Sequence, residues 1–483
     1  MIETKEKTDE QRRIGQIWRY SKDHGANAWG RGIIAAAGGF GKSYTACKFI
    51  ITPFLENAFS KGKFNTTVIL LVPTEKLLID WNDKVRKLIP HKFHESIKVL
   101  SSKSIGRDTK IYHCDLLAVD EIHLMYGEQE VGCIDGSLIK FTYNVALSAT
   151  PIDKNGVWKG MKKLWPIIYR LTKKEAIEKG FITRFREYNL GIRLPHEDMK
   201  KYNEYSNNLN ALYEKYGDYN VLFECAQGKK DFFGIKRTPW DIANDIAGTH
   251  DWSPDCSEEI HELWNPNQIL EDARVLLTNV RLRKEMLYEH PLKVMWAMKV
   301  IKKFPKVRTI SFSQSIMFAE NLHTACTDEA IPASLYHSGM ESRPVMEGGQ
   351  YIRYKTGAKK GSVKLFGKDS LKKMAIHELT TGQTYVLSTT SSLDVGLDIP
   401  SMRIGIITSR TTNKNKQDQR GYRVTRIDLF NPENDAILVN IYFKDTQDEK
   451  WLNSAQYKTD STIYDIKDVD EIELDVEDDG FTL

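Results

Sequence analysis

The chain has 483 residues, too many for one ordinary hydrophobic core and suited to two or three domains. Hydrophobic residues make up 41% and charged residues 28%, a globular composition, and no apolar run reaches the roughly 18 residues that a membrane-spanning helix needs. The amino-terminal residues lack the apolar core of a secretory signal, and the six cysteines form no C-x-x-C pair. We therefore expect a cytoplasmic protein with reduced thiols, without a zinc site or a disulfide framework.

Charge is unevenly distributed along the chain. Residues 460–480 contain ten acidic residues and one lysine, Lys467, although the whole chain has a formal net charge of +4. The remaining residues therefore carry a positive excess, which suits a phosphate-backbone partner, although lysines that merely maintain solubility give the same count. We expect the acidic segment to be a largely disordered tail, with recruitment of a protein partner or folding back on the basic body as alternatives.

The first informative segment lies near the amino terminus. An apolar run at residues 32–35 predicts a short buried strand, and residues 44–50 predict the start of a helix. Between them, residues 36–43 have the spacing of a phosphate-binding loop, in which Lys42 can reach the β- and γ-phosphates and Ser43 can bind Mg²⁺. Backbone N–H groups can approach a phosphate at the glycines of this loop, which are Gly38, Gly39 and Gly41. A glycine-rich turn that happens to precede a lysine is the alternative.

A pair of carboxylates follows a second predicted strand. The apolar run at residues 116–119 is typical of a central parallel strand, and it ends in Asp120 and Glu121. In a nucleotide hydrolase Asp120 would orient the Mg²⁺ shell and Glu121 would act as the general base for water. A solvated acidic turn is the alternative, and the phosphate-binding loop upstream makes it the weaker interpretation.

Further segments follow in a fixed order, at residues 13–16, 71–81, 147–151, 309–313, 387–390, 396–400 and 419–426. Together with the two segments above, they resemble the motifs of superfamily 2 helicases and translocases of the DExH type. The resemblance spans roughly residues 10–430 and implies binding of ATP and Mg²⁺ between two RecA-like domains. It is closest to DNA repair, branch-migration and restriction motors, including the UvsW type of phage helicase. We therefore expect a cytoplasmic enzyme, in the host cytoplasm if a phage encodes it.

The resemblance assigns roles to residues outside the two motifs described above. Contacts to the nucleotide are implied for Arg13, Gln16, Gly396 and Asp398. Coupling between the motifs is implied for His123, Ser148 and Thr150, and contacts to nucleic acid for Pro73, Thr74, Ser313 and Thr389. A catalytic role across the domain cleft is implied for Gln419, Arg423 and Arg426, although Tyr422 stands where the family usually has glycine.

The alternation of predicted strands and helices indicates an α/β fold. With the resemblance, we expect two RecA-like doubly wound parallel-sheet domains, a helical insertion and a disordered acidic tail. The expected ranges are 1–185 for the ATP-binding domain, 186–290 for a helical insertion and hinge linker, 291–455 for the second domain and 456–483 for the tail.

An insertion at residues 343–368 has a pattern of its own. Residues 350–355 and 362–366 alternate like strands, and the segment between them is typical of a turn. We expect a basic, aromatic β-hairpin that contacts DNA, with a solubilising surface hairpin as the equal alternative. The basic residues expected to touch nucleic acid are Arg353, Lys355, Lys359 and Lys360.

The sequence thus predicts a monomeric ATP hydrolase that moves on DNA and unwinds or remodels branched or single-stranded DNA, with no membrane partner. An RNA-dependent ATPase or a transcript-release translocase is one alternative. A nucleotide-switched clamp that binds nucleic acid without unwinding it is another.

Overall fold

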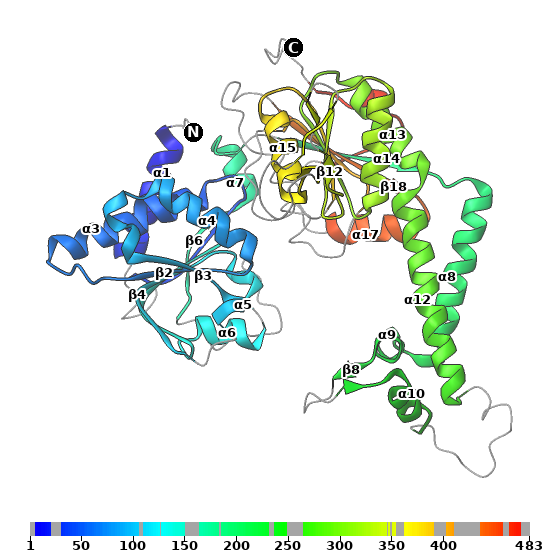
Figure 1. The fold of residues 1–483 in the computed structure, drawn as a ribbon, viewed down its shortest axis with the longest axis horizontal. Helices are drawn as coiled ribbons and strands as arrows, with labels where there is room; N and C mark the ends of the chain where they lie inside the picture. Colours follow the sequence, from blue (N-terminus) through cyan, green and yellow to red (C-terminus); the bar gives the residue numbers. More distant parts are fainter. Residues whose placement is uncertain are drawn as a thin grey trace.

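The computed structural model contains two α/β domains and a helical arm (Figure 1). It describes residues 5–20, 30–105, 110–125, 127–149, 164–182, 185–230, 236–248, 264–344, 346–347, 350–353, 362–390, 402–409, 435–456 and 463–474. Each domain is built around one parallel sheet, so the predicted fold class is confirmed. Among the described residues, no helix has both the length and the apolar character needed to cross a bilayer.

The first domain has a six-stranded sheet in the order β3-β2-β4-β5-β1-β6, in which every pair is parallel. Its strands are β1 (Ile33–Ala36), β2 (Val68–Val72), β3 (Ile97–Ser101), β4 (Tyr112–Val119), β5 (Ile139–Ser148) and β6 (Ile167–Leu171). Its helices are α1 (Lys5–Tyr20), α2 (Lys42–Thr45), which continues as a π-helix (Ala46–Ile51) and α3 (Thr52–Ser60), α4 (Glu75–Leu88), α5 (Ser102–Ile105), α6 (Glu128–Ile134) and α7 (Lys173–Glu178).

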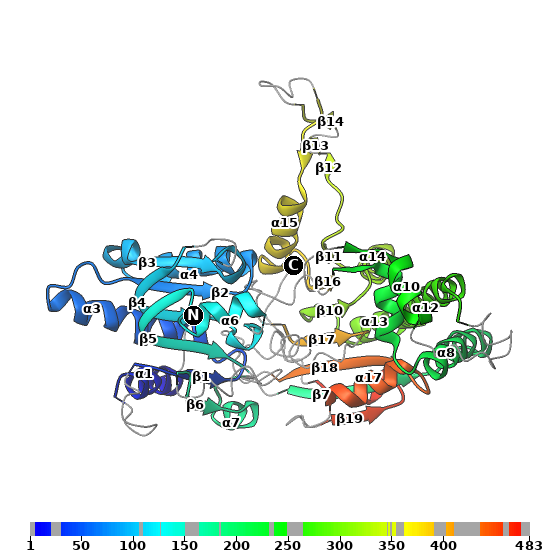
Figure 2. The same cartoon turned by 90° about the horizontal axis from the view of Figure 1, so that it is seen from below.

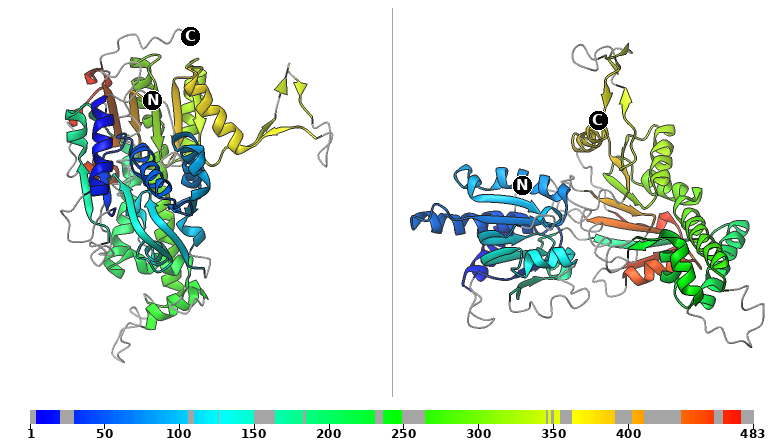
Figure 3. Two further views of the ribbon diagram at one scale, coloured as in Figure 1. Left: turned by 90° about the vertical axis from the view of Figure 1, so that its left-hand side faces the viewer. Right: turned by 60° about the horizontal axis from the view of Figure 1, so that its bottom comes forward.

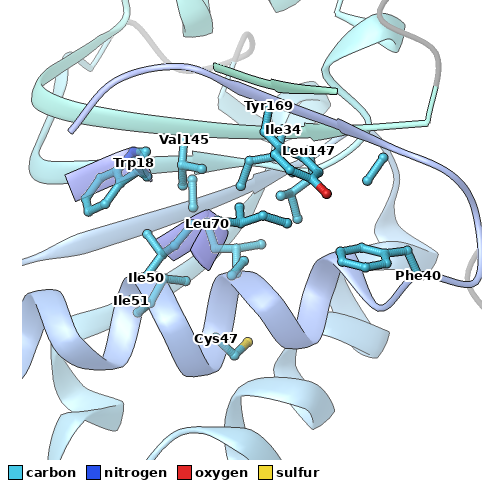
Figure 4. Packing of buried hydrophobic residues seen from close by; sticks show 14 of the residues in the cluster. Trp18, Ile34, Phe40, Cys47, Ile50, Ile51, Leu70, Val145, Leu147 and Tyr169 are labelled. Carbon is cyan, nitrogen blue, oxygen red and sulfur yellow. The ribbon is translucent and has the colours of Figure 1, made fainter. Parts of the chain in front are cut away.

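Both faces of this sheet are covered, which is why its strands are continuous apolar runs instead of alternating ones. Within β1, Ile34 belongs to the apolar cluster on one face and Ile33 to the cluster on the other. Leu70 and Leu147 pack beside Ile34 under the helix that follows the phosphate-binding loop (Figure 4). The loop is therefore anchored between a buried strand and a buried helix.

The second domain has a seven-stranded parallel sheet in the order β11-β16-β10-β17-β18-β7-β19. Its strands are β7 (Phe185–Ile192), β10 (Thr309–Ser313), β11 (Ala333–Tyr336), β16 (Val386–Thr390), β17 (Ile404–Ile407), β18 (Ala436–Phe443) and β19 (Ile463–Ile466). Its helices are α13 (Pro291–Lys303), α14 (Ile316–Asp328), α15 (Lys368–Thr380) and α17 (Gln447–Gln456).

Two strands of this sheet come from parts of the chain that lie outside the range expected for the second domain, residues 291–455. Strand β7 pairs with β18 over eight residues, so the segment expected to open the helical insertion belongs to the second sheet. Strand β19 pairs with β7, which places residues 463–466 of the expected tail at the edge of the same sheet. Ile466, Val469 and Ile472 are buried in the core of the second domain, and this burial holds residues 463–474 in place.

The helical arm extends from the second domain between β7 and α13 (Figure 1). Its elements are α8 (His196–Tyr216), α9 (Tyr219–Gln227), the short strands β8 (Lys229–Lys230) and β9 (Lys236–Arg237), α10 (Pro239–Gly248) and α12 (Pro266–Glu289). The arm has its own apolar core, and its two long helices are joined by Asp272, which accepts hydrogen bonds from Lys215 Nζ at 2.6 Å and from Tyr216 Oη at 2.7 Å.

The insertion at residues 343–368 projects away from the second sheet (Figures 2 and 3). The expected arms, residues 350–355 and 362–366, are joined among the described residues by the antiparallel bridge Arg353–Val363. Residues 365–366 of the second arm pair instead with residues 343–344. Residues 350–351 of the first arm pair with residues 346–347, which form a second short antiparallel pair. Its short strands are β12 (Arg343–Pro344), β13 (Met346–Glu347), β14 (Gln350–Tyr351) and β15 (Leu365–Phe366).

Candidate nucleotide-binding site

The sequence motifs of the first domain meet at one edge of its sheet. The phosphate-binding loop follows β1, Thr74 follows β2, Asp120 follows β4 and Ser148 ends β5. These four strands are parallel neighbours in the sheet, so their carboxyl ends share one edge. Ligands of open α/β sheets bind outside this edge, which makes it the candidate site.

The phosphate-binding loop has the backbone that its glycines permit. Gly39 has φ 82° and Gly41 has φ 94°, in the left-handed region that residues with a Cβ atom avoid. Lys42 opens the helix, and its Nζ donates to the carbonyl of Ala36 at 3.0 Å, on the floor of the loop. Burial lowers the pKa of Lys42, while the nearby carboxylates of Glu121 and Asp120 act in the opposite direction.

Helix α1 supports the loop through two residues to which the sequence motifs give no role. Gln11 is buried and its Nε2 donates to the carbonyl of Phe40 at 3.0 Å, while Lys7 Nζ donates to the carbonyl of Gly39 at 3.1 Å. The expected nucleotide contacts Arg13 and Gln16 lie on the exposed face of the same helix.

The helical period explains why Lys7 and Gln11 face the loop while Arg13 and Gln16 do not. The buried positions of α1 recur at Lys7, Gln11, Ile14 and Trp18, which form one helical stripe, whereas Arg13 pairs with Glu10 at 2.9 Å outside it. Counting the apolar stripe would have selected Gln11, because Gln11 stands one turn before Ile14 on the same face.

The acidic pair lies at the centre of the site. Asp120 is 7% exposed; its Oδ1 accepts from the backbone N–H of Glu121 at 3.0 Å and its Oδ2 from Trp81 Nε1 at 2.7 Å. Glu121 has φ 49°, an uncommon conformation for a residue with a side chain, and such strain concentrates at functional sites. Burial raises the pKa of both carboxyl groups, and Lys42 and Lys84 oppose this effect.

His123 links the acidic pair to the end of β5. Its ring is buried, and Nδ1 lies 3.0 Å from Ser148 Oγ and 3.2 Å from Glu121 Oε2. The two motifs are therefore joined by one imidazole, which is the geometry a coupling role needs.

The arrangement fits a nucleotide with Mg²⁺. The loop offers backbone N–H groups and a lysine. The Oε2 atom of Glu121 is buried and makes no hydrogen bond among the described residues, although His123 Nδ1 lies 3.2 Å away. A hard cation prefers hydroxyl and carboxylate oxygens, which Ser43 and Asp120 present at this edge. No group of three or more His, Cys, Asp or Glu side chains that could hold a metal ion occurs in the described part of the chain.

The residues expected to contact nucleic acid differ in how accessible they are. Thr74 is half-buried, and its Oγ1 accepts from the backbone N–H of Leu77 at 3.3 Å, so it caps α4. Ser313 and Thr389 are fully buried, and Thr389 Oγ1 donates to the carbonyl of Tyr336 at 2.8 Å. Pro73 is also buried, so among these four residues Thr74 has the most accessible side chain.

Several predicted residues lie outside the described ranges. They are Thr150, Lys355, Lys359, Lys360, Gly396, Asp398, Gln419, Arg423 and Arg426. Their expected roles stay predictions.

Comparisons with known proteins bear on this geometry. Residues 4–153 match the family model described as type III restriction enzyme, res subunit. That segment contains the phosphate-binding loop, the acidic pair and Ser148. A search of the curated proteins found no match.

Solved structures to which the chain is similar include the following two. The Pyrococcus furiosus Hef helicase domain superposes with a TM-score of 0.50 at 15% identity, covering 92% of this chain and 97% of that one. S. cerevisiae Dbp5 bound to RNA and ADP BeF3 gives a TM-score of 0.48 at 12% identity, with 95% and 89% coverage. At such identities the likeness to Hef shows a shared fold alone.

Proposed function

We propose that this protein is an ATP-dependent DNA helicase or translocase of the superfamily 2 DExH type, acting on branched or single-stranded DNA. The observation that carries the proposal is the convergence of Lys42, the Asp120–Glu121 pair and the His123–Ser148 contact at one sheet edge. The helicase-like fold and the match of residues 4–153 support it.

The chemistry assigned to the site follows from these side chains. MgATP is the substrate, and the ion it carries neutralises charge on the phosphates when bound. Lys42 and the loop N–H groups hold the phosphates, and Ser43 and Asp120 hold the ion. Glu121 accepts the proton of the attacking water, for which a raised pKa brings it nearer to neutral pH.

Residues of the second domain complete the proposed catalytic site. Arg423 and Arg426 stabilise charge on the transferred phosphoryl group, a contribution of about 10³–10⁵ in rate in enzymes of this kind. Gln419 takes part in catalysis across the domain cleft, and Gly396 and Asp398 contact the nucleotide. These assignments rest on the resemblance of their motifs.

The choice of DNA rests on the motifs, and the projecting hairpin offers a surface that suits contact with nucleic acid. Tyr351 and Leu365 are 55% and 49% exposed on this hairpin, and basic residues flank them in the sequence. An exposed aromatic beside cations is suited to stacking on bases and contacting phosphates. We assign the hairpin to strand separation near a fork.

One experiment separates this function from its alternatives. ATP turnover is measured side by side with single-stranded DNA, duplex DNA, forked DNA, a four-way junction and RNA. Stimulation by DNA together with strand separation supports the proposal, and stimulation by RNA alone supports an RNA-dependent ATPase. Tight nucleotide binding with negligible turnover on every substrate indicates a nucleotide-switched clamp.

A further inference from the structure

Helix α4 starts at the expected nucleic-acid contact and continues into the nucleotide site. Thr74 caps its first turn, and Trp81 follows two helical turns later, about 10 Å along the axis. Trp81 is 1% exposed, and its indole N–H donates to Asp120 Oδ2 at 2.7 Å. One rigid element therefore joins a half-buried strand-end residue to the carboxylate expected to bind Mg²⁺.

The next turn of α4 makes a second contact with the site. Lys84 Nζ donates to Ser43 Oγ at 3.5 Å and forms an ion pair with Asp80 at 2.6 Å. The same ammonium group lies 5.3 Å from the centre of the Trp81 ring. Asp80 and Trp81 thus hold the lysine over Ser43.

Both side chains expected to hold the ion, Ser43 and Asp120, are therefore contacted from one helix. The terminal torsion of an aspartate has a broad energy minimum, so its oxygens need partners to keep one orientation. Asp120 accepts one hydrogen bond from the backbone N–H of the next residue, Glu121, and another from the indole N–H of Trp81. Groups that orient metal ligands change metal affinity or activity by about 10–100-fold when they are removed.

The acceptor distinguishes Trp81 from the other buried tryptophans of the described first domain. A buried indole N–H needs a partner, and Trp18 and Trp165 both donate to backbone carbonyls at 2.8 Å. Trp81 donates to a functional carboxylate instead. Packing alone does not require that acceptor.

We propose that Trp81 is a positioning residue for Asp120, and that α4 transmits the occupancy of the Thr74 edge to the two ion-binding side chains. The inference rests on the proposed ATP hydrolysis and adds to it a route by which nucleic acid changes the nucleotide site. Trp81 acts through its N–H, and Lys84 acts through Ser43.

The test compares Trp81→Phe with Trp165→Phe in the full-length chain. Each substitution keeps an aromatic ring and removes one buried N–H donor, so a structural role alone gives both variants the same small drop in melting temperature. Binding of a fluorescent ATP analogue is measured with EDTA and across a Mg²⁺ titration, and turnover is measured with and without DNA.

For Trp81→Phe we expect unchanged analogue affinity in EDTA and an increase of about 10-fold in the Mg²⁺ concentration for half-maximal tight binding. Turnover at saturating nucleotide falls with little change in KM, and the ratio of DNA-stimulated to basal turnover falls towards one. Trp165→Phe keeps wild-type values. A Trp81→Phe variant that matches Trp165→Phe in its Mg²⁺ requirement overturns the inference, and so does an unchanged stimulation ratio.

Lys84→Met provides an independent arm, with Lys87→Met, an exposed lysine on the same helix, as its control. Lys84→Met is expected to raise the Mg²⁺ requirement and Lys84→Arg to restore it; a Lys84→Met variant that equals Lys87→Met counts against the inference. A wild-type protein without Mg²⁺-dependent nucleotide binding overturns the proposed function itself, and the inference with it.

Discussion

Nδ1 of His123 lies 3.0 Å from Oγ of Ser148 and 3.2 Å from Oε2 of Glu121. The imidazole therefore touches the expected general base and the end of strand β5 at once. A change at the nucleotide can reach Ser148 through this single ring.

Ser148→Ala should separate hydrolysis from movement. The substitution removes one buried hydrogen bond, and a partner lost from such a network costs about 1–2 kcal/mol, or about tenfold in a rate that depends on it. We expect strand separation to fall about tenfold while ATP affinity and basal turnover stay within about threefold, measured on the same preparation. An equal fall in both activities contradicts a coupling role.

Lys42→Ala should abolish turnover. The ammonium group lies at the floor of the loop, and its loss removes the charge that holds the phosphates, so we expect at least a 10²-fold loss of turnover. Lys48→Ala is the matched control, because Lys48 lies in the same helical segment and is exposed. A Lys42→Ala variant that keeps wild-type turnover excludes this loop as the catalytic site.

Glu121→Gln should stop hydrolysis and stabilise the ligand-free protein at neutral pH. Burial raises the pKa of Glu121, so the folded state binds this proton more tightly than the unfolded state does. The wild type therefore loses stability as the pH rises from the ordinary glutamate value through the raised one. Glutamine carries no charge and lacks this loss.

Urea unfolding without nucleotide from pH 5 to pH 8 checks this sign. The variant should gain on the wild type as the pH rises, reaching about 0.5–2 kcal/mol, a usual gain when a functional site is neutralised. A gain that shrinks with rising pH contradicts the assigned burial. The turnover of the variant should fall by about 10²-fold or more, because the general base is absent.

Lys293→Met should destabilise the second domain strongly. Lys293 Nζ donates to Asp448 Oδ2 at 2.6 Å and to the carbonyl of Thr408, and both charged side chains are buried. Removing the lysine leaves a buried carboxylate without its counter-ion, which costs about 3–5 kcal/mol. Denaturant midpoints measure the loss.

Two control variants test whether the buried, unpaired charge causes the loss of stability. Lys293→Met combined with Asp448→Asn leaves no buried charge and should recover part of the stability. Lys302→Met breaks an exposed pair with Glu329 and should cost less than about 1 kcal/mol. Equal losses for Lys293→Met and Lys302→Met would show that burial of the first pair is irrelevant.

Shortening the hairpin should impair unwinding alone. Pro344 and Leu365 face each other in the antiparallel register, so two glycines can join them after removal of residues 345–364. We expect unwinding of forked DNA to fall by at least tenfold while ATP turnover stimulated by single-stranded DNA stays within about twofold. Unchanged unwinding leaves the hairpin a surface feature.

The residues proposed to bind the phosphates could be found in the sequence because their chemistry is local. The loop at residues 36–43 and the pair Asp120–Glu121 are continuous segments whose strands are recognisable from their own apolar runs. The parallel sheets were predictable for the same reason. The apolar stripe of α1 indicates which face is buried, but only the structure shows that this face meets the loop, where Gln11 Nε2 donates to the carbonyl of Phe40.

The sequence by itself determined the chemical groups of the site and the strands that end at them. Only the tertiary structure decided that Trp81 meets Asp120, that β7 and β19 complete the second sheet and that His123 joins Glu121 to Ser148. The physical reason is sequence separation: these contacts join segments far apart in the chain, and their partners are chosen by burial and packing of whole elements.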